Sequence, residues 1–188
     1  MTFVVLILAY AILASLFYVE YHYKARTTTT LQTAGDDRGT TRLLLLSYLI
    51  AITTPLVCLL LLDTTTAMSD YVKWTGLGIM FSAIFFLRWA TTVNPFYLPS
   101  LSTTDDQFIC TDGPYKLIRH PGYCAFIVAW FGFGLTTGSW IAFFIIFLLL
   151  SVVYLLRIQA EEQMMLDRFG VDYQQYMNET YRIIPYVY

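Results

Sequence analysis

A chain of 188 residues that is 57% hydrophobic and only 13% charged is too apolar for an average soluble domain. With a formal net charge of -2 and no basic tract, it has no surface suited to nucleic acid. Its three cysteines form neither a CxxC pair nor an even-numbered disulfide framework, and no cluster of potential ligands predicts a metal site. The composition predicts an integral membrane protein.

The hydropathy pattern predicts five membrane-spanning helices, since each span needs roughly 20 mostly apolar residues. The first lacks the basic start of a cleaved signal peptide, so we expect it to be retained. An uncharged stretch over residues 121–156 is too long for one span and contains one turn signal, TTGS, so it predicts a helical hairpin. The predicted spans are 2–19, 43–62, 71–87, 121–136 and 140–156.

The basic residues predict the orientation of the chain. Of the eleven Lys and Arg residues, ten fall in the loops after the first and third spans or after the fifth span, and Lys73 alone falls on the other side. Because cytoplasmic segments are enriched in Lys and Arg, we expect the N-terminus outside and the tail 157–188 in the cytoplasm. The fold class is therefore all-α, one membrane domain over residues 1–188, in the inner or plasma membrane if the source is prokaryotic.

The stretch GPYKLIRHPGY, residues 113–123, concentrates polar groups at the start of the fourth span. Pro121 suits the first turn of a helix and the residue before a proline prefers an extended backbone, so His120 is the expected boundary. Free backbone N–H groups and the helix dipole then join Arg119, His120 and Tyr123 in a site suited to a polar or anionic ligand. Taken singly, each residue also fits a membrane anchor or an interfacial aromatic.

The fifth span ends in a second polar cluster. Arg157 and Glu161 lie four residues apart, on one helix face, and Glu162 is adjacent. Carboxylates at this depth are candidates for function, although a simple boundary of the span with a snorkelling arginine also fits. Because the hairpin brings the inner ends of spans four and five together, His120 and Tyr123 should meet Arg157 and Glu161 in one pocket. The preceding loop and the tail would roof it.

The tail is predicted to extend the fifth helix and then to break at Gly170. A second short helix is expected over residues 172–180, with Asp172 as its N-terminal cap.

The segments CTDGPYKLIRHPGY and RIQAEEQMMLDRFGVDYQQYMNETYRIIP resemble the isoprenylcysteine carboxyl methyltransferase family, within a wider group that includes phospholipid N-methyltransferases. The shared pattern is GxYxxxRHPxY, an uncharged hairpin, and then R…EE…FGxxYxxY. It covers residues 107–185, about two fifths of the chain. The resemblance implies an integral-membrane methyltransferase that uses S-adenosyl-L-methionine on a lipophilic or lipid-linked acceptor.

The resemblance also implies residue roles. Arg157 would face the acceptor, where its guanidinium could orient a carboxylate with two hydrogen bonds. On chemical grounds, His120 or a Glu could serve as base for an acceptor that must lose a proton, and Arg157 and His120 are the candidate catalytic residues. The residues expected to line the cofactor pocket are Gln107, Phe108, Ile109, Cys110, Tyr115, His120, Pro121, Gly122, Tyr123 and Glu161.

Three other readings of the sequence stay open. A phospholipid or small-amine N-methyltransferase would share the same motifs. An NADPH-dependent reductase of the sterol-reductase type has a similar hairpin region, but that family is larger and has more spans. A non-enzymatic membrane module is disfavoured because no charge lies in mid-membrane to mark an ion path.

Overall fold

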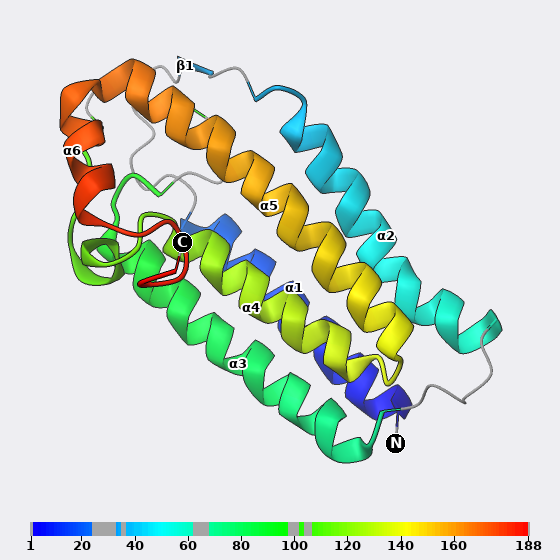
Figure 1. Cartoon of the computed structure of the whole chain (residues 1–188). Helices are drawn as coiled ribbons and strands as arrows, with labels where there is room; N and C mark the ends of the chain where they lie inside the picture. Colours follow the sequence, from blue (N-terminus) through cyan, green and yellow to red (C-terminus); the bar gives the residue numbers. More distant parts are fainter. Residues whose placement is uncertain are drawn as a thin grey trace.

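The computed structural model describes residues 2–23, 33–34, 37–61, 68–97, 102–103 and 107–187 as a bundle of helices. The helices are α1 (Thr2–Tyr23), α2 (Thr40–Leu61), α3 (Asp70–Val93), the 3-10 helix η2 (Gly113–Lys116), α4 (Pro121–Thr136), α5 (Trp140–Phe169) and α6 (Val171–Glu179). The start of α1 and the C-terminal tail lie at opposite ends of the bundle (Figure 1).

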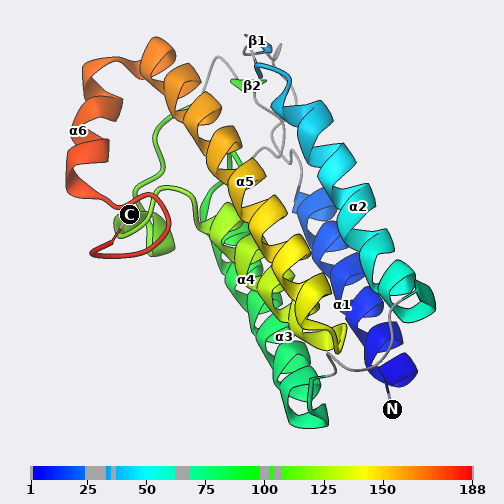
Figure 2. The ribbon, with the colours of Figure 1, turned by 45° about the vertical axis from the view of Figure 1, so that its right-hand side comes forward.

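Helix α4 is the most enclosed of the long helices. It packs against α3 and α5 and also contacts α1, while α2 packs on α5 (Figures 1 and 2). Its burial explains why its sequence is apolar on every side. The largest fully buried side chains are led by Trp130, Tyr154, Phe126 and Phe133, so the core is an aromatic cluster centred on α4.

Two glycines set the close approach of α3 and α4. A Cβ atom on Gly76 would lie 2.6 Å from the carbonyl oxygen of Gly132, and one on Gly132 would lie 2.6 Å from that of Gly76. Small residues at a helix crossing let the two backbones pack directly, as in other membrane bundles. This contact holds α4 in the middle of the bundle.

Four helices in the described part of the chain are long and apolar enough to cross a bilayer: residues 3–23 of α1, together with α2, α3 and α5. Helix α4 is equally apolar but has 16 residues. Helix α2 turns many large apolar side chains outward, Leu60 and Leu61 among them. An outer surface of this kind suits lipid, and the protein is an integral, multi-pass membrane protein.

Helices occur at all five predicted positions, and α4 has the predicted bounds. Helix α3 continues past the predicted end of its span to Val93, and α5 continues to Phe169. The hydropathy pattern marks only the apolar part of a helix, whereas the helix itself ends where its last turn is capped. In α3 the hydroxyl groups of Thr91 and Thr92 bond back to carbonyls of the preceding turn. Leu62, the predicted end of the second span, lies outside the described residues. The number of crossings and the orientation stay predictions.

The tail breaks at Gly170, as predicted, with a φ of 53°. The prediction that Asp172 caps the next helix is wrong. Gly170 is the N-terminal cap of α6. Asp172 lies in the first turn, where its negative charge interacts favourably with the positive end of the helix dipole.

Within the described residues, the fold is all-α apart from a two-residue antiparallel pair and an isolated bridge between Ile118 and Tyr181. Strand β1 (Thr33–Ala34) pairs with β2 (Ser102–Thr103), with Thr33 opposite Thr103. The pair joins the loop after α1 to the loop after α3.

Candidate active site

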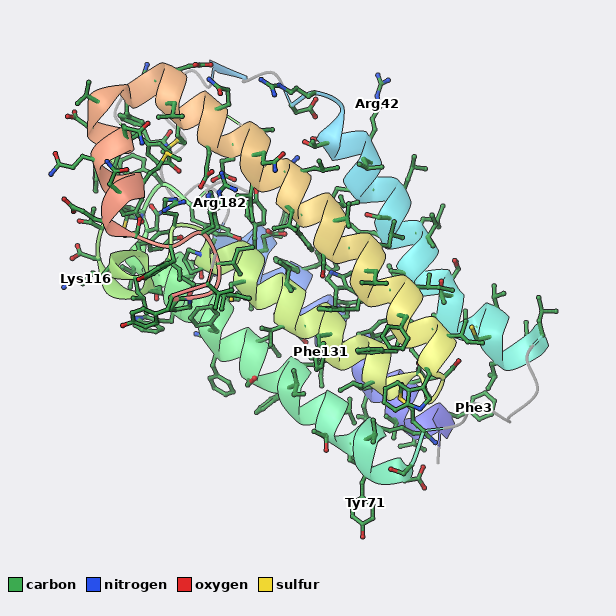
Figure 3. The ribbon with its side chains drawn as sticks, in the orientation of Figure 1. Phe3, Arg42, Tyr71, Lys116, Phe131 and Arg182 are labelled. Atoms are coloured by element: carbon green, nitrogen blue, oxygen red, sulfur yellow. The ribbon has the colours of Figure 1, made fainter. Side chains whose placement is uncertain are left out.

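A pocket lies at the end of the bundle where α4 begins and α5 runs on past its apolar part. The loop after α3, η2 and α6 surround it, and Lys116 and Arg182 mark this end in Figure 3. The pocket is partly open and has a volume of about 90 Å³. Such a cavity exceeds the space that one or two water molecules need.

All ten residues predicted to line a cofactor pocket line this cavity: Gln107, Phe108, Ile109, Cys110, Tyr115, His120, Pro121, Gly122, Tyr123 and Glu161. The sequence prediction missed eight others: Asn94, Phe96, Tyr97, Arg119, Met164, Met165, Tyr173 and Tyr176. Arg119 was expected to help form a site for a polar or anionic ligand, but it was not among the residues predicted to line the cofactor pocket. Met164 and Met165 share the α5 face of Glu161 and could have been found from helical spacing, whereas Asn94, Phe96 and Tyr97 carry no sequence signal.

His120 is the helix boundary, as predicted, and its buried ring lies between two neighbouring carboxylates. Its Nδ1 is 3.7 Å from Oε1 of Glu161 and its Nε2 is 3.3 Å from Oε1 of Glu162. The ring also stacks on Tyr123, with 5.8 Å between ring centroids. The imidazole is therefore held by a hydrogen bond at Nε2 and by Tyr123 on one face, with the Glu161 carboxylate near Nδ1.

Glu162 is the centre of a buried charge network. It is only 3% exposed, and it accepts hydrogen bonds from Nε of Arg119 at 2.9 Å and Nε of Arg182 at 2.7 Å. A buried carboxylate is tolerated only when cations and hydrogen bonds compensate for its lost hydration. The sequence placed Glu162 beside Glu161 and gave it no role, because its partners come from distant segments.

Arg119 belongs to this network and ties it to the tail. Besides Glu162, its guanidinium donates to the carbonyl oxygens of Met177, at 3.0 Å, and of Thr180. Arg119 was expected to help bind an anionic ligand. Although it lines the pocket, its charge is already matched by Glu162.

Backbone hydrogen bonds also join the tail to the segment before α4. The amide of Arg119 donates to the carbonyl of Tyr181 at 2.8 Å, and that of His120 to Arg182 at 3.1 Å. In return the amide of Tyr181 donates to Leu117 at 2.9 Å. The tail therefore sets the backbone position of His120.

Aromatic and sulfur-containing side chains supply most of the remaining lining. Burial raises the pKa of the phenols of Tyr115, Tyr173 and Tyr176, so all three stay protonated. Tyr176 donates to the carbonyl of Tyr115 at 2.8 Å, which links α6 to η2. Burial likewise raises the pKa of the Cys110 thiol and keeps it from acting as a thiolate.

Arg157 is set apart from the cavity lining. It is 3% exposed and donates to Oγ1 of Thr41 at 3.1 Å and of Thr40 at 3.4 Å, both in the first turn of α2. Its contact with the pocket is through Tyr123, whose hydroxyl interacts with Arg157 and Glu161. The structure thus brings His120, Tyr123 and Glu161 together and places Arg157 on the α2 side of them.

Fold and site together define a class: a multi-pass helical membrane protein with a polar and aromatic pocket at one end of its bundle. Residues 64–172, more than half of the chain, match the phospholipid methyltransferase family, and the chain belongs to that family. The resemblance predicted from the motifs is thereby confirmed.

A curated relative is the Protein-S-isoprenylcysteine O-methyltransferase of Schizosaccharomyces pombe. It is 30% identical over 82 residues, which are 44% of this chain and 35% of the relative. The match therefore spans about a third of the relative's length. Within the described residues, no group of three or more His, Cys, Asp or Glu side chains could hold a metal ion.

Proposed function

We propose that the chain is an S-adenosylmethionine-dependent integral-membrane methyltransferase that acts on a lipophilic acceptor, with a carboxylate as the group modified. One observation carries this proposal: the ten residues implied by the family motifs, from two segments far apart in sequence, line a single cavity. A non-enzymatic membrane protein would not require these residues to meet in one cavity.

The lining suits the chemistry of the cofactor. Glu161 can accept hydrogen bonds from an ammonium group or ribose hydroxyls, and aromatic faces such as Phe108 and Tyr115 can hold an adenine ring. The N-terminus of α4, with His120, suits a carboxylate. Since the pocket is partly open, the cofactor would extend into its mouth. When bound, it supplies a methyl group activated by a positively charged sulfur.

The acceptor side is proposed to lie near Arg157. A guanidinium matches a carboxylate with two parallel hydrogen bonds, and the hydroxyls of Thr40 and Thr41 hold this guanidinium in place. A carboxylate carries its own nucleophilic oxygen, so the protein needs mainly to position it. For an amine acceptor, His120, held between Glu161 and Glu162, is the available proton acceptor.

In this proposal α4 and α5 cross the membrane as a hairpin, which gives five spans, with the pocket at the cytoplasmic face and the N-terminus outside. The support is the placement of the cations: ten of the eleven fall in segments assigned to the pocket side. An acceptor with a long apolar tail could then reach the site from the bilayer between helices.

The proposal is tested by supplying the purified protein with cofactor labelled in its methyl group and a whole-cell lipid extract. We expect label in the lipid fraction, released as methanol by mild alkali, because methyl esters hydrolyse and N-methyl groups do not. Arg157→Ala should lower this transfer at least tenfold while leaving S-adenosylhomocysteine binding unchanged, and Arg168→Ala, on the exposed face of α5, is the matched control.

Three results would argue against parts of this proposal. Alkali-stable label would favour the N-methyltransferase alternative. Binding of NADPH in place of S-adenosylhomocysteine would favour the reductase. Equal transfer by Arg157→Ala and wild type would remove Arg157 from the acceptor side.

A further inference from the structure

Glu20 is a charged residue within the part of α1 that is long and apolar enough to span a membrane. The proposed function gives this residue no role. It lies near the C-terminal end of α1, is half-buried, and accepts a hydrogen bond from the hydroxyl of Tyr97 at 3.2 Å. The contact joins residues 77 apart in sequence. A carboxylate in a membrane helix is costly, and it is retained where it has a partner and a use.

Tyr97 connects Glu20 to the pocket. It lines the cavity and lies against the first turn of α4, where a Cβ atom on Gly122 would be 2.8 Å from the Tyr97 hydroxyl oxygen. A larger residue at position 122 would force this ring to move. The phenol oxygen is therefore held at the start of α4, beside His120 and Tyr123, in the segment proposed to bind the cofactor.

The direction of the hydrogen bond decides what Tyr97 can do. Burial, and then the Glu20 carboxylate, raise the pKa of Tyr97 well above its usual range, so the phenol stays protonated and donates to Glu20. Donation to a carboxylate shifts electron density onto the phenol oxygen and ring. Both become better partners for a nearby positive charge.

The neighbouring charges agree with this role. Arg119 and Arg182 both pair with Glu162, so both guanidinium groups face that carboxylate. Glu20 and Arg157 both act on Tyr48, and the Arg157 guanidinium donates hydrogen bonds to the threonines of α2. Glu20 acts on Tyr97 and Glu161 acts on Tyr123, so each of these two phenols has a carboxylate beside it.

We propose that Glu20 is a positioning residue that acts through Tyr97: it fixes and polarises the phenol so that the pocket favours a cationic sulfur over a neutral one. The inference rests on the proposed cofactor and deepens it. Because α1 lies outside the family match over residues 64–172, this chain would complete a shared pocket with a residue from its own first helix.

The test compares the affinities of S-adenosylmethionine, which carries a sulfonium, and S-adenosylhomocysteine, which carries a neutral sulfur. We expect Glu20→Gln to lower the ratio of the S-adenosylmethionine affinity to the S-adenosylhomocysteine affinity about three- to tenfold. The S-adenosylhomocysteine affinity itself should stay within about twofold of wild type. Tyr97→Phe should lower the ratio similarly, and the double variant should add little, since both changes remove one interaction. Glu179→Gln and Tyr18→Phe, at exposed positions, are the matched controls.

The outcomes separate this inference from the proposed function. An unchanged ratio in Glu20→Gln, or an equal loss of both affinities, overturns the charge role of Glu20 while the cofactor assignment stands. A wild-type protein that binds neither nucleoside overturns the proposed function and this inference with it.

Discussion

The two ends of the bundle both bury a cation, and they do so in different ways. At the far end, Nζ of Lys73 pairs with Asp70 at 2.9 Å, three residues away on the same helix, and its stem packs on Gly138 in the turn between α4 and α5. At the pocket end, Glu162 joins Arg119 and His120 from the segment before α4 with Arg182 from the tail. The far end closes a turn locally, whereas the pocket end depends on tertiary contacts that also position a site.

The largest effect is expected from breaking the pocket-end network. Glu162→Ala leaves the buried guanidinium of Arg119 and the partly exposed one of Arg182 without their carboxylate, and breaking a buried pair costs about 3–5 kcal/mol. We expect the tail to separate from the segment before α4 and nucleoside binding to be lost. Unfolding in detergent, together with limited proteolysis of the tail, measures both effects. Wild-type stability in this variant would mean that the network does not hold the tail.

A smaller loss of stability is expected at the crossing of α3 and α4, which lies between the two ends. A substitution there should leave the charged contacts at both ends unchanged. Gly132→Ala places a methyl group 2.6 Å from the carbonyl oxygen of Gly76, and overpacking of this kind costs about 1–3 kcal/mol. Gly78→Ala is the matched control, because a Cβ atom there meets nothing within 4 Å. Thermal unfolding in one detergent compares them, and equal midpoints would contradict the close crossing of α3 and α4.

The smallest effect is expected at the far end. The carboxylate side chain of Asp70 is 49% exposed, and partly exposed ion pairs contribute only about 0–1 kcal/mol. Lys73→Met should therefore change stability by less than about 1 kcal/mol and leave nucleoside affinity within twofold. A loss of nucleoside binding in this variant would show that the two ends are coupled and would remove the contrast between them.

The sequence predicted those parts of the molecule that depend on local chemistry. The boundary at His120 follows from the backbone limits before a proline, and the meeting of Tyr123 with Glu161 follows from a hairpin with a tight turn. Both need only neighbours in the chain or one antiparallel pair.

The remaining site residues depend on contacts that periodicity does not encode. Arg182 reaches Glu162 from an irregular segment after α6, and Tyr97 reaches the pocket from the loop after α3. Arg157 was expected in the shared pocket, but it turns to Thr40 and Thr41, whose position depends on how α2 packs against α5. Hydropathy locates helices and does not choose their neighbours.

The most direct test of the central claim is a titration of the purified protein with S-adenosylhomocysteine, for wild type, Glu161→Ala and the exposed control Glu179→Ala. We predict saturable binding by wild type and the control, and at least a tenfold weaker affinity for Glu161→Ala with its unfolding midpoint unchanged. Equal affinities in all three proteins, or no binding by any of them, would contradict the assignment of this pocket to the cofactor.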